Sequence, residues 1–418
     1  MRRKLSQVCS LALSLALTGP LAAQSTAERS AQKADAAPVA AESYRSQRTR
    51  KAMNNWRVAP SIRIDAEYDD NIFLLGSGRK DNVEDPSSEE VISGRYADMK
   101  QASDLLTTVS AGFVLMGPGL FAKPALIVPE LSYERYTQNA QRSNLGVGVS
   151  IQQEAWAGRL RLQGKVTPKY FARNYLADAV DQDASGSITE DERVYAPGEY
   201  SEGEFAADYR FPLSKATKHH PFGVSIQLGG GFASRSYAAP LASRNLDGPM
   251  AGAKLLLDLG RRLELDLGYD YSSMAGASST QVLLLNESDF GQDFNGNGTQ
   301  DDLDARVATL VDRSRKEHRA GATLQFELSK PVDVALGYEY RWRQYTSNQP
   351  LDVSHRGRKD ARHQVSGDIR FRLTKDLRFR AGGVHSRQGH NRSGDPGSLG
   401  EIDDYTRSQA RLGLSYEL

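Results

Sequence analysis

Residues 263–271 read LELDLGYDY, with an apolar or aromatic side chain at every second position. Successive side chains of a β-strand point to opposite faces, so this stretch has one apolar face and one mostly acidic face. The same alternation recurs from residue 56 to the end of the chain, for example at 62–68, 334–342 and 410–418. The sequence therefore predicts an all-β fold in which each strand separates an apolar surface from a charged one.

The connections between these strands alternate in length, with short turns followed by longer polar loops such as 74–103 and 276–315. An even strand number, with short turns at one end and long loops at the other, is typical of bacterial outer-membrane barrels. We therefore expect a transmembrane antiparallel up-and-down β-barrel of about 14 strands, with short periplasmic turns and long extracellular loops. The predicted strands are 56–73, 104–117, 125–137, 144–155, 158–176, 201–214, 222–237, 249–260, 262–275, 316–329, 332–346, 361–374, 377–390 and 405–418.

A soluble β-sandwich or propeller would also show alternation, because its strands are buried on one face and wet on the other. The long strands and the lack of a blade-length repeat favour the membrane barrel. Aromatic residues near strand ends also favour it, because such residues form girdles at the membrane interfaces. The aromatic residues expected in the girdles are Trp56, Tyr68, Tyr136, Tyr170, Tyr237, Tyr271, Trp342 and Tyr345.

The first residues have the pattern of a secretory signal peptide. A basic start and a short apolar run precede a small-residue cleavage site, which predicts a signal peptide at 1–23. We expect a flexible periplasmic tail at 24–55 and the barrel at 56–418, in the outer membrane of a bacterium. Mean hydropathy is −0.54, and no later apolar run reaches the ~18 residues of a membrane helix. The net charge of +1 gives no reason to expect nucleic acid as a partner.

The segment 66–73, AEYDDNIF, resembles the first strand of β-barrel porins of the uncharacterised "porin 2" type. A polar loop, a strand such as 105–115 and the YERY segment at 133–136 follow in the order those porins show. The resemblance implies an outer-membrane barrel, and such barrels are suspected of roles in polysaccharide export or passive diffusion. One departure is the chain end: many outer-membrane barrels end in Phe, whereas this sequence ends in Leu418.

Two loops have the spacing of calcium-binding loops, and calcium is the cofactor we expect. Residues 181–192, DQDASGSITEDE, place oxygen-bearing side chains at the ligand positions of an EF-hand loop, Gly at position 6 and Glu at position 12. Residues 293–304, DFNGNGTQDDLD, resemble the dockerin variant with Asp at position 12. The alternative for both is a polar turn without an ion. We expect short helices at 171–176 and 307–312 to flank them. The predicted ligands are Asp181, Asp183, Ser185, Ser187, Thr189 and Glu192 in the first loop, and Asp293, Asn295, Asn297, Thr299, Asp301 and Asp304 in the second.

The charged faces of the strands would line the lumen, with both signs present. Two interpretations stand equal: a charge-separated constriction for an anionic or zwitterionic solute, or an ion-pair lattice that rigidifies the barrel. The lumen residues we predict are Arg159, Arg161, Lys165, Arg341, Arg343, Arg370, Arg372, Arg378, Arg380, Glu264, Asp266 and Glu339. Lys169 would lie on the same face as Lys165.

We therefore expect a porin-like channel for a polar or anionic solute or a polysaccharide, surrounded by outer-membrane lipid. A non-conducting scaffold or adhesin is one alternative, and an outer-membrane hydrolase is another. The two sequence pairs that suggest a hydrolase are His385-Ser386 and Ser354-His355. Because no nucleophile motif such as G-x-S-x-G accompanies them, we do not expect an enzyme.

Overall fold

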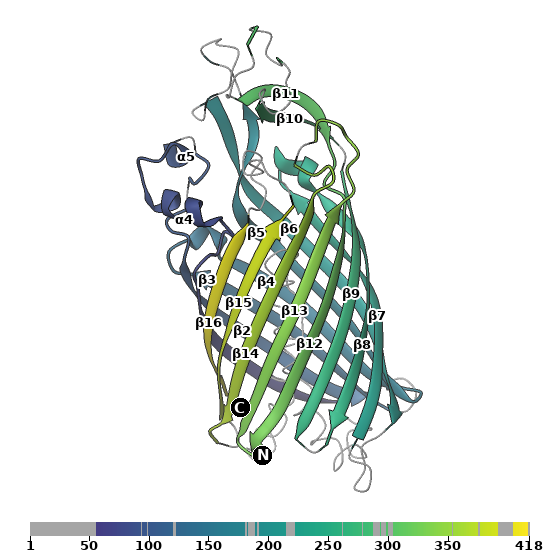
Figure 1. Ribbon diagram of the computed structural model, residues 1–418. Helices are drawn as coiled ribbons and strands as arrows, with labels where there is room; N and C mark the ends of the chain where they lie inside the picture. The colour runs from purple at the N-terminus through teal and green to yellow at the C-terminus, as the bar shows by residue number, and fades with distance from the viewer. Residues whose placement is uncertain are drawn as a thin grey trace.

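The protein is a closed antiparallel β-barrel of 14 strands (Figure 1). The computed structural model describes residues 56–418 except 93, 98, 120–122, 180–181, 183–188, 190–191, 215–221, 261, 278, 287–292, 294–297, 300–303, 353, 375–376, 392–403 and 417–418. The predicted signal peptide and tail lie outside the described residues. The barrel strands are β1 (Arg57–Asp69), β2 (Asp104–Pro118), β3 (Pro124–Tyr136), β4 (Asn144–Ala155), β5 (Gly158–Ala179), β6 (Arg193–Ser214), β7 (Phe222–Tyr237), β8 (Leu246–Leu259), β9 (Leu263–Gly276), β12 (Arg315–Ser329), β13 (Val332–Tyr345), β14 (Lys359–Arg372), β15 (Leu377–His390) and β16 (Tyr405–Tyr416).

Each strand pairs with the next along the chain, and β1 pairs with β16 to close the barrel. The predicted strands match the observed ones closely, with three differences. β6 begins at Arg193, well before residue 201, because it pairs with the long β5 beyond the membrane. Residues 171–176 belong to β5 and not to a helix. The expected loop 276–315 contains a separate hairpin, β10 (Ser279–Asn286) with β11 (Asp304–Val311), so the helix expected at 307–312 is also wrong.

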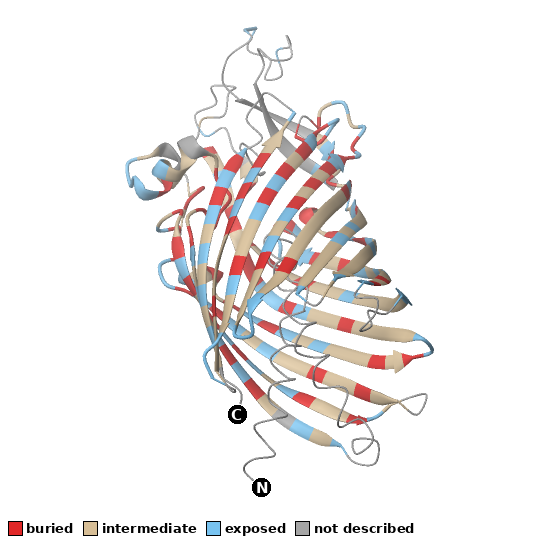
Figure 2. Cartoon of the chain, turned by 60° about the horizontal axis from the view of Figure 1, so that its bottom comes forward, coloured by how far each residue is buried: buried red, intermediate tan, exposed pale blue. Residues whose placement is uncertain are grey.

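Buried and exposed residues alternate along the strands (Figure 2), and this alternation separates the lumen of the barrel from its outside. On β1, Ile62 and Ile64 are 46% and 51% exposed, whereas Arg63 between them is 9% exposed. Apolar side chains therefore cover the outer wall, and polar ones fill the interior, as a bilayer requires. This is the structure of an outer-membrane barrel, and its long connections lie at the extracellular end.

The aromatic girdle differs from the prediction. Trp56 and Tyr68 are exposed on the outer wall, but Tyr136, Tyr170, Tyr237 and Tyr345 are buried inside. The interior tyrosines pack on one another and on arginines, because they lie on the inward face of their strands. Ring centroids of Tyr170 and Tyr200 are 5.1 Å apart, and those of Tyr200 and Tyr237 are 5.0 Å apart. Other aromatic residues on the outer wall are Tyr133, Trp156, Tyr269 and Tyr338.

The extracellular connection after β1 contains α4 (Ser77–Glu84) and α5 (Glu89–Ile92). Its start is fixed by Asn71, which donates to the Leu75 carbonyl at 2.8 Å and accepts from the Leu75 N–H at 2.9 Å. Two 3₁₀ turns, η2 (Ala140–Arg142) and η4 (Leu241–Arg244), cap other strand ends. Among the described residues, no helix is long and apolar enough to cross a membrane.

Candidate functional site: the charged lumen

Three arginines lie directly opposite one another on neighbouring strands, facing the lumen. They are Arg319 on β12, Arg341 on β13 and Arg362 on β14. Like charges directly opposite each other in a sheet are destabilising. The same arrangement recurs nearer the periplasm, where Arg370 lies opposite Arg380 and Arg372 lies opposite Arg378. A wall built only for stability would alternate the signs of the charges across these positions.

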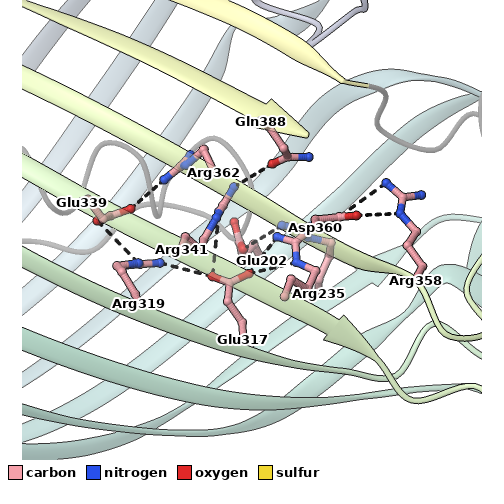
Figure 3. A network of polar contacts seen from close by, with 11 residues as sticks. Glu202, Arg235, Glu317, Arg319, Glu339, Arg341, Arg358, Asp360, Arg362 and Gln388 are labelled. Carbon is pink, nitrogen blue, oxygen red and sulfur yellow. Dashed lines mark hydrogen bonds and ion pairs between the residues drawn. The ribbon is translucent and has the colours of Figure 1, made fainter. Parts of the chain in front are cut away.

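Two glutamates offset part of the repulsion in the arginine row. Glu317 accepts from Arg343 at 2.8 and 3.0 Å, and it lies 3.4 Å from Arg319 and 3.8 Å from Arg341. Glu339 accepts from Arg362 at 2.8 Å and lies 3.6 Å from Arg319. Arg343 and Arg362 are only 2% and 1% exposed. The row therefore contains more arginines than carboxylates, and each glutamate is shared by two or more arginines (Figure 3).

The network continues in both directions around the lumen. Asp360 accepts from Arg358 at 2.7 Å and lies 3.7 Å from Arg343. Gln388 on β15 accepts from Arg341 at 3.3 Å. Figure 3 also shows Glu202 of β6 and Arg235 of β7, which are 3.4 Å apart. The polar contacts thus occupy the extracellular half of the lumen.

A second cluster lies nearer the periplasm, and the barrel seam has an ion pair of its own toward the extracellular end. Asp368 binds Arg380 at 3.0 Å and Arg411 at 2.5 Å. At the seam, Asp69 accepts from Arg407 with an Nε–Oδ2 distance of 2.9 Å, and both side chains are 3% exposed. The Asp368–Arg411 and Asp69–Arg407 pairs join residues that are 43 and 338 positions apart in sequence.

Three aspartates that face the lumen lie directly opposite a glycine on a neighbouring strand. Asp270 lies opposite Gly252, Asp368 opposite Gly382, and Asp65 opposite Gly413. A Cβ atom added at the three glycines would lie 2.3, 2.1 and 2.4 Å from the facing carboxylate oxygen. The glycines therefore let each carboxylate lie along the wall, where it reaches the arginines beside it.

A lumen cavity of about 300 Å³ lies between β5–β9 and β12–β14. Glu204, Asp208, Asp266 and Asp270 contribute acids from β6 and β9, and the arginines Arg319 and Arg370 come from β12 and β14. Glycines from five strands form much of its wall. Acids and cations line both sides of the cavity, because Arg161 and Lys254 lie on β5 and β8, and Glu317, Glu339 and Asp368 lie on β12–β14. Mixed charge of this kind suits a solute that carries charge or many polar groups.

The structure places the predicted lumen residues on the inward faces of their strands. Glu339, Arg341, Arg343 and Arg380 belong to the networks described above. Arg161 binds Asp208 at 2.7 Å. The other predicted lumen residues on these inward faces are Arg159, Lys165, Glu264, Asp266, Arg370, Arg372 and Arg378.

Lys169 is a correction, because its side chain is 67% exposed and bound to Glu199 at 2.8 Å. A β-bulge between Thr167 and Tyr170 changes the face that it occupies. Prediction from the sequence missed Arg319, Glu317, Asp360 and Arg362, although the same alternation of apolar and polar residues marks them. It also missed Arg407.

Most of the predicted calcium ligands fall outside the described residues. These are Asp181, Asp183, Ser185, Ser187, Asn295, Asn297 and Asp301. Glu192, at position 12 of the first loop, turns its buried carboxylate inward. It accepts from the Gln182 N–H at 2.6 Å and from the Thr189 N–H at 2.9 Å. In the second loop, Asp293 accepts from the N–H of Gly298 at 2.7 Å, and Gly298 has a left-handed φ of +84°.

These contacts fit the closed turn of a calcium loop, in which position 6 needs a left-handed glycine and position 12 faces inward. Thr299 is also described, and Asp304 begins β11. Within the described ranges, no group of three or more His, Cys, Asp or Glu side chains is placed to hold a metal ion.

The two sequence pairs that suggested a hydrolase lie in different environments. His385 is exposed on the outer wall and hydrogen-bonded to Ser408, whereas its neighbour Ser386 is buried on the lumen side. Adjacent residues of one strand cannot converge on one substrate atom. Ser354 and His355 lie in the 346–358 connection, where His355 binds Asp352 at 2.7 Å.

Comparison with known proteins concerns the fold alone. No protein-family model matches the chain, and no curated protein matches it in sequence. Similar solved structures include OmpT, an outer membrane protein of Vibrio cholerae, at 7% identity, 86% coverage of this chain, 97% of that chain and a TM-score of 0.37. They also include an anion-selective porin from Comamonas acidovorans, at 10% identity, 87% and 99% coverage and a TM-score of 0.33. The outer membrane channel DcaP of Acinetobacter baumannii has 8% identity, 87% and 98% coverage and a TM-score of 0.37. These identities and TM-scores are low, and the barrel architecture is therefore established by the strand pairing of the chain itself.

Proposed function

We propose that the protein is a porin-like channel through which an anionic or polar solute crosses the outer membrane. The observation that carries the proposal is the row of Arg319, Arg341 and Arg362 directly opposite one another. Opposite charges at such positions stabilise a sheet by about 0.2–1 kcal/mol per pair, and like charges oppose it. A lattice that only rigidified the barrel would not keep three arginines in register. A lumen that attracts anions would keep them.

Planar-bilayer conductance under a salt gradient tests this proposal. The wild-type protein should conduct with a preference for anions. R319Q/R341Q/R362Q should lose that preference, because three positive charges leave the row. R341K retains a charge at its position and should keep most of the preference. R135Q is the matched control, because Arg135 is exposed outside the barrel.

Heat-modifiable migration on gels shows whether each variant is folded. A folded wild-type protein that conducts no ions would overturn the channel proposal. Unchanged ion preference in the folded triple variant would overturn the role of the arginine row.

Sugar acids and acidic polysaccharides carry carboxylates for the arginines and hydroxyl groups for the acids of the cavity. We also propose that the chain belongs to the "porin 2" type, which the resemblance of 66–73 supports. A non-conducting scaffold is the outcome that a silent barrel would favour.

We also propose that the loops 181–192 and 293–304 bind calcium. The inward carboxylate of Glu192 and the Asp293–Gly298 turn support the assignment. If bound, calcium would be held by side-chain oxygens of each loop, and the repulsion between their acids would fall. Calorimetry should show calcium heats that E192Q reduces, because Gln cannot supply two charged oxygens. Chelation should increase protease cutting at 177–200 and 276–315 without changing heat-modifiable migration. Identical heats for E192Q and wild type would contradict the site in the first loop.

A further inference from the structure

Three histidines lie on the outer wall of the barrel, toward its extracellular end. They are His318 on β12, His363 on β14 and His385 on β15. The register places them along a staircase. His385 lies opposite Val365, two residues below His363; His363 lies opposite Tyr340, two residues below Trp342; and Trp342 lies opposite His318. Because barrel strands are tilted, such a staircase follows one level around the wall.

Each of these imidazoles is oriented in the same way, by a hydroxyl group on a neighbouring strand. The Nδ1 atom of His318 is 2.7 Å from the Tyr269 hydroxyl. The Nδ1 atom of His363 is 2.9 Å from the Tyr338 hydroxyl. For His385 the partner is the Ser408 hydroxyl at 3.0 Å. A hydroxyl that donates to Nδ1 keeps the proton of a neutral ring on Nε2, which makes that nitrogen a hydrogen-bond donor.

Three long cationic side chains lie just above the histidines. Lys316 and Arg387 are each two residues nearer the extracellular end than His318 and His385, and Lys359 is four residues nearer than His363. All three are exposed. We call these six residues the basic band. Among the described residues that face outward on β12–β15, none is an acid.

The wall beneath the basic band changes in order from aromatic to apolar. Trp342 stacks on His318 with 4.6 Å between ring centroids, and Tyr338 is 47% exposed. Leu336, Val365 and Ile369 follow toward the periplasm, all exposed. This order matches hydrocarbon, interface and headgroup layers of a bilayer. On the adjoining part of the wall, the corresponding outward residues of β7–β9 are Ser234, Ser236, Asp247 and Ser273, without a cation.

We infer that the basic band binds the phosphate groups of an anionic lipid in the outer leaflet. The outer wall of a membrane barrel faces lipid, and the band lies at headgroup level. Lysine and arginine supply positive charge, and the histidine Nε2 atoms supply donors to phosphate oxygens. Each cation near a charged membrane surface adds to the attraction between the protein and anionic lipids. The inference rests on the fold and the membrane location, and it does not depend on the proposed channel.

Lipid retention tests the inference directly. Wild-type protein and K316Q/K359Q/R387Q are purified in mixed micelles that contain lipid A, a diphosphorylated glycolipid, and bound lipid is counted by native mass spectrometry. The wild type should retain lipid A, and the triple variant should bind it more than about tenfold more weakly. R135Q removes an outward arginine on β3, away from the band, and should retain lipid A as the wild type does.

Two further measurements separate the other outcomes. Dephosphorylated lipid A should bind the wild type as weakly as it binds the triple variant. Equal retention of both lipids by the wild type would overturn the inference, because it would show contact with acyl chains only. Loss of an oligomer in the triple variant, with lipid retention unchanged, would overturn it in favour of an interface between copies of the chain. The ion preference in planar bilayers should be the same for the wild type and for K316Q/K359Q/R387Q. A failure of the lipid inference is therefore distinct from a failure of the channel proposal.

Discussion

At Gly382, a hydrogen atom in place of a side chain leaves room for the Asp368 carboxylate, which binds Arg380 and Arg411. Gly382→Ala would place a Cβ atom 2.1 Å from that carboxylate. Asp368 must then move, and the loss of one charge-assisted hydrogen bond costs about 1.5–3 kcal/mol. We expect a lower denaturant midpoint for the barrel in micelles.

Gly148→Ala in β4 is the matched control, because the nearest atom to its new Cβ is at an ordinary 3.7 Å. It should leave the midpoint almost unchanged. Equal midpoints for the two variants would show that the Asp368 carboxylate has space to rearrange.

Alternation in the sequence was enough to predict single lumen residues such as Glu339, Arg341 and Arg343. It could not predict their partners, because the partner of a strand residue depends on register. Arg319 lies opposite Arg341 only because β12 and β13 are aligned in that way. Lys169 shows the other limit, since a bulge reverses the faces of the residues around it.

At the scale of elements, the connection 346–358 is held closed by one buried carboxylate. Asp352 accepts from His355 at 2.7 Å, from the Ser347 hydroxyl at 2.7 Å and from the Asp312 N–H at 3.0 Å. Burial favours the protonated acid, but the hydrogen bonds from His355, Asp312 and Ser347 outweigh it and lower the pKa of Asp352 below its ordinary value of 3.8.

A group whose pKa is lower in the folded protein stabilises it above the ordinary pKa, and that stabilisation is lost as the pH falls through the folded value. The connection should therefore stay closed at neutral pH and open below about pH 4. Hydrogen exchange of 346–358 across this range measures the opening. Asp352→Asn should show fast exchange already at neutral pH. Identical protection of the wild type at about pH 3 and about pH 7, on the two sides of the ordinary pKa, would contradict the role of Asp352.

Apart from the early start of β6, the strands were predictable to within a few residues because each of them alternates between lipid and lumen. Extracellular elements were less predictable, because they face neither a continuous apolar layer nor a lumen. β5 continues past the membrane with bulges that break the alternation, and 171–176 was assigned both to the strand 158–176 and to a short helix beside the first loop. The β10–β11 hairpin has no alternating pattern beside the calcium-type motif, and its strands were placed in a loop.

At the scale of the molecule, the even strand number and the alternating connection lengths were sufficient to predict a closed barrel. Closure pairs β1 with β16 in one register, in which Ile62 lies opposite Tyr416. The sequence did not indicate which lumen charges would form the seam. Those contacts depend on how the first and last strands meet, which no local pattern records.

The ion pair between Asp69 and Arg407 joins residues 338 positions apart. Contacts of such long sequence separation form late in folding, after the shorter hairpins have zipped along the chain. Until then β1 and β16 are open edges that can pair with other chains. A slip of one residue at closure would turn Arg407 toward hydrocarbon and leave Asp69 buried without its cation. The seam pair therefore favours the observed register over a slipped one, because only this alignment brings the two buried charges together.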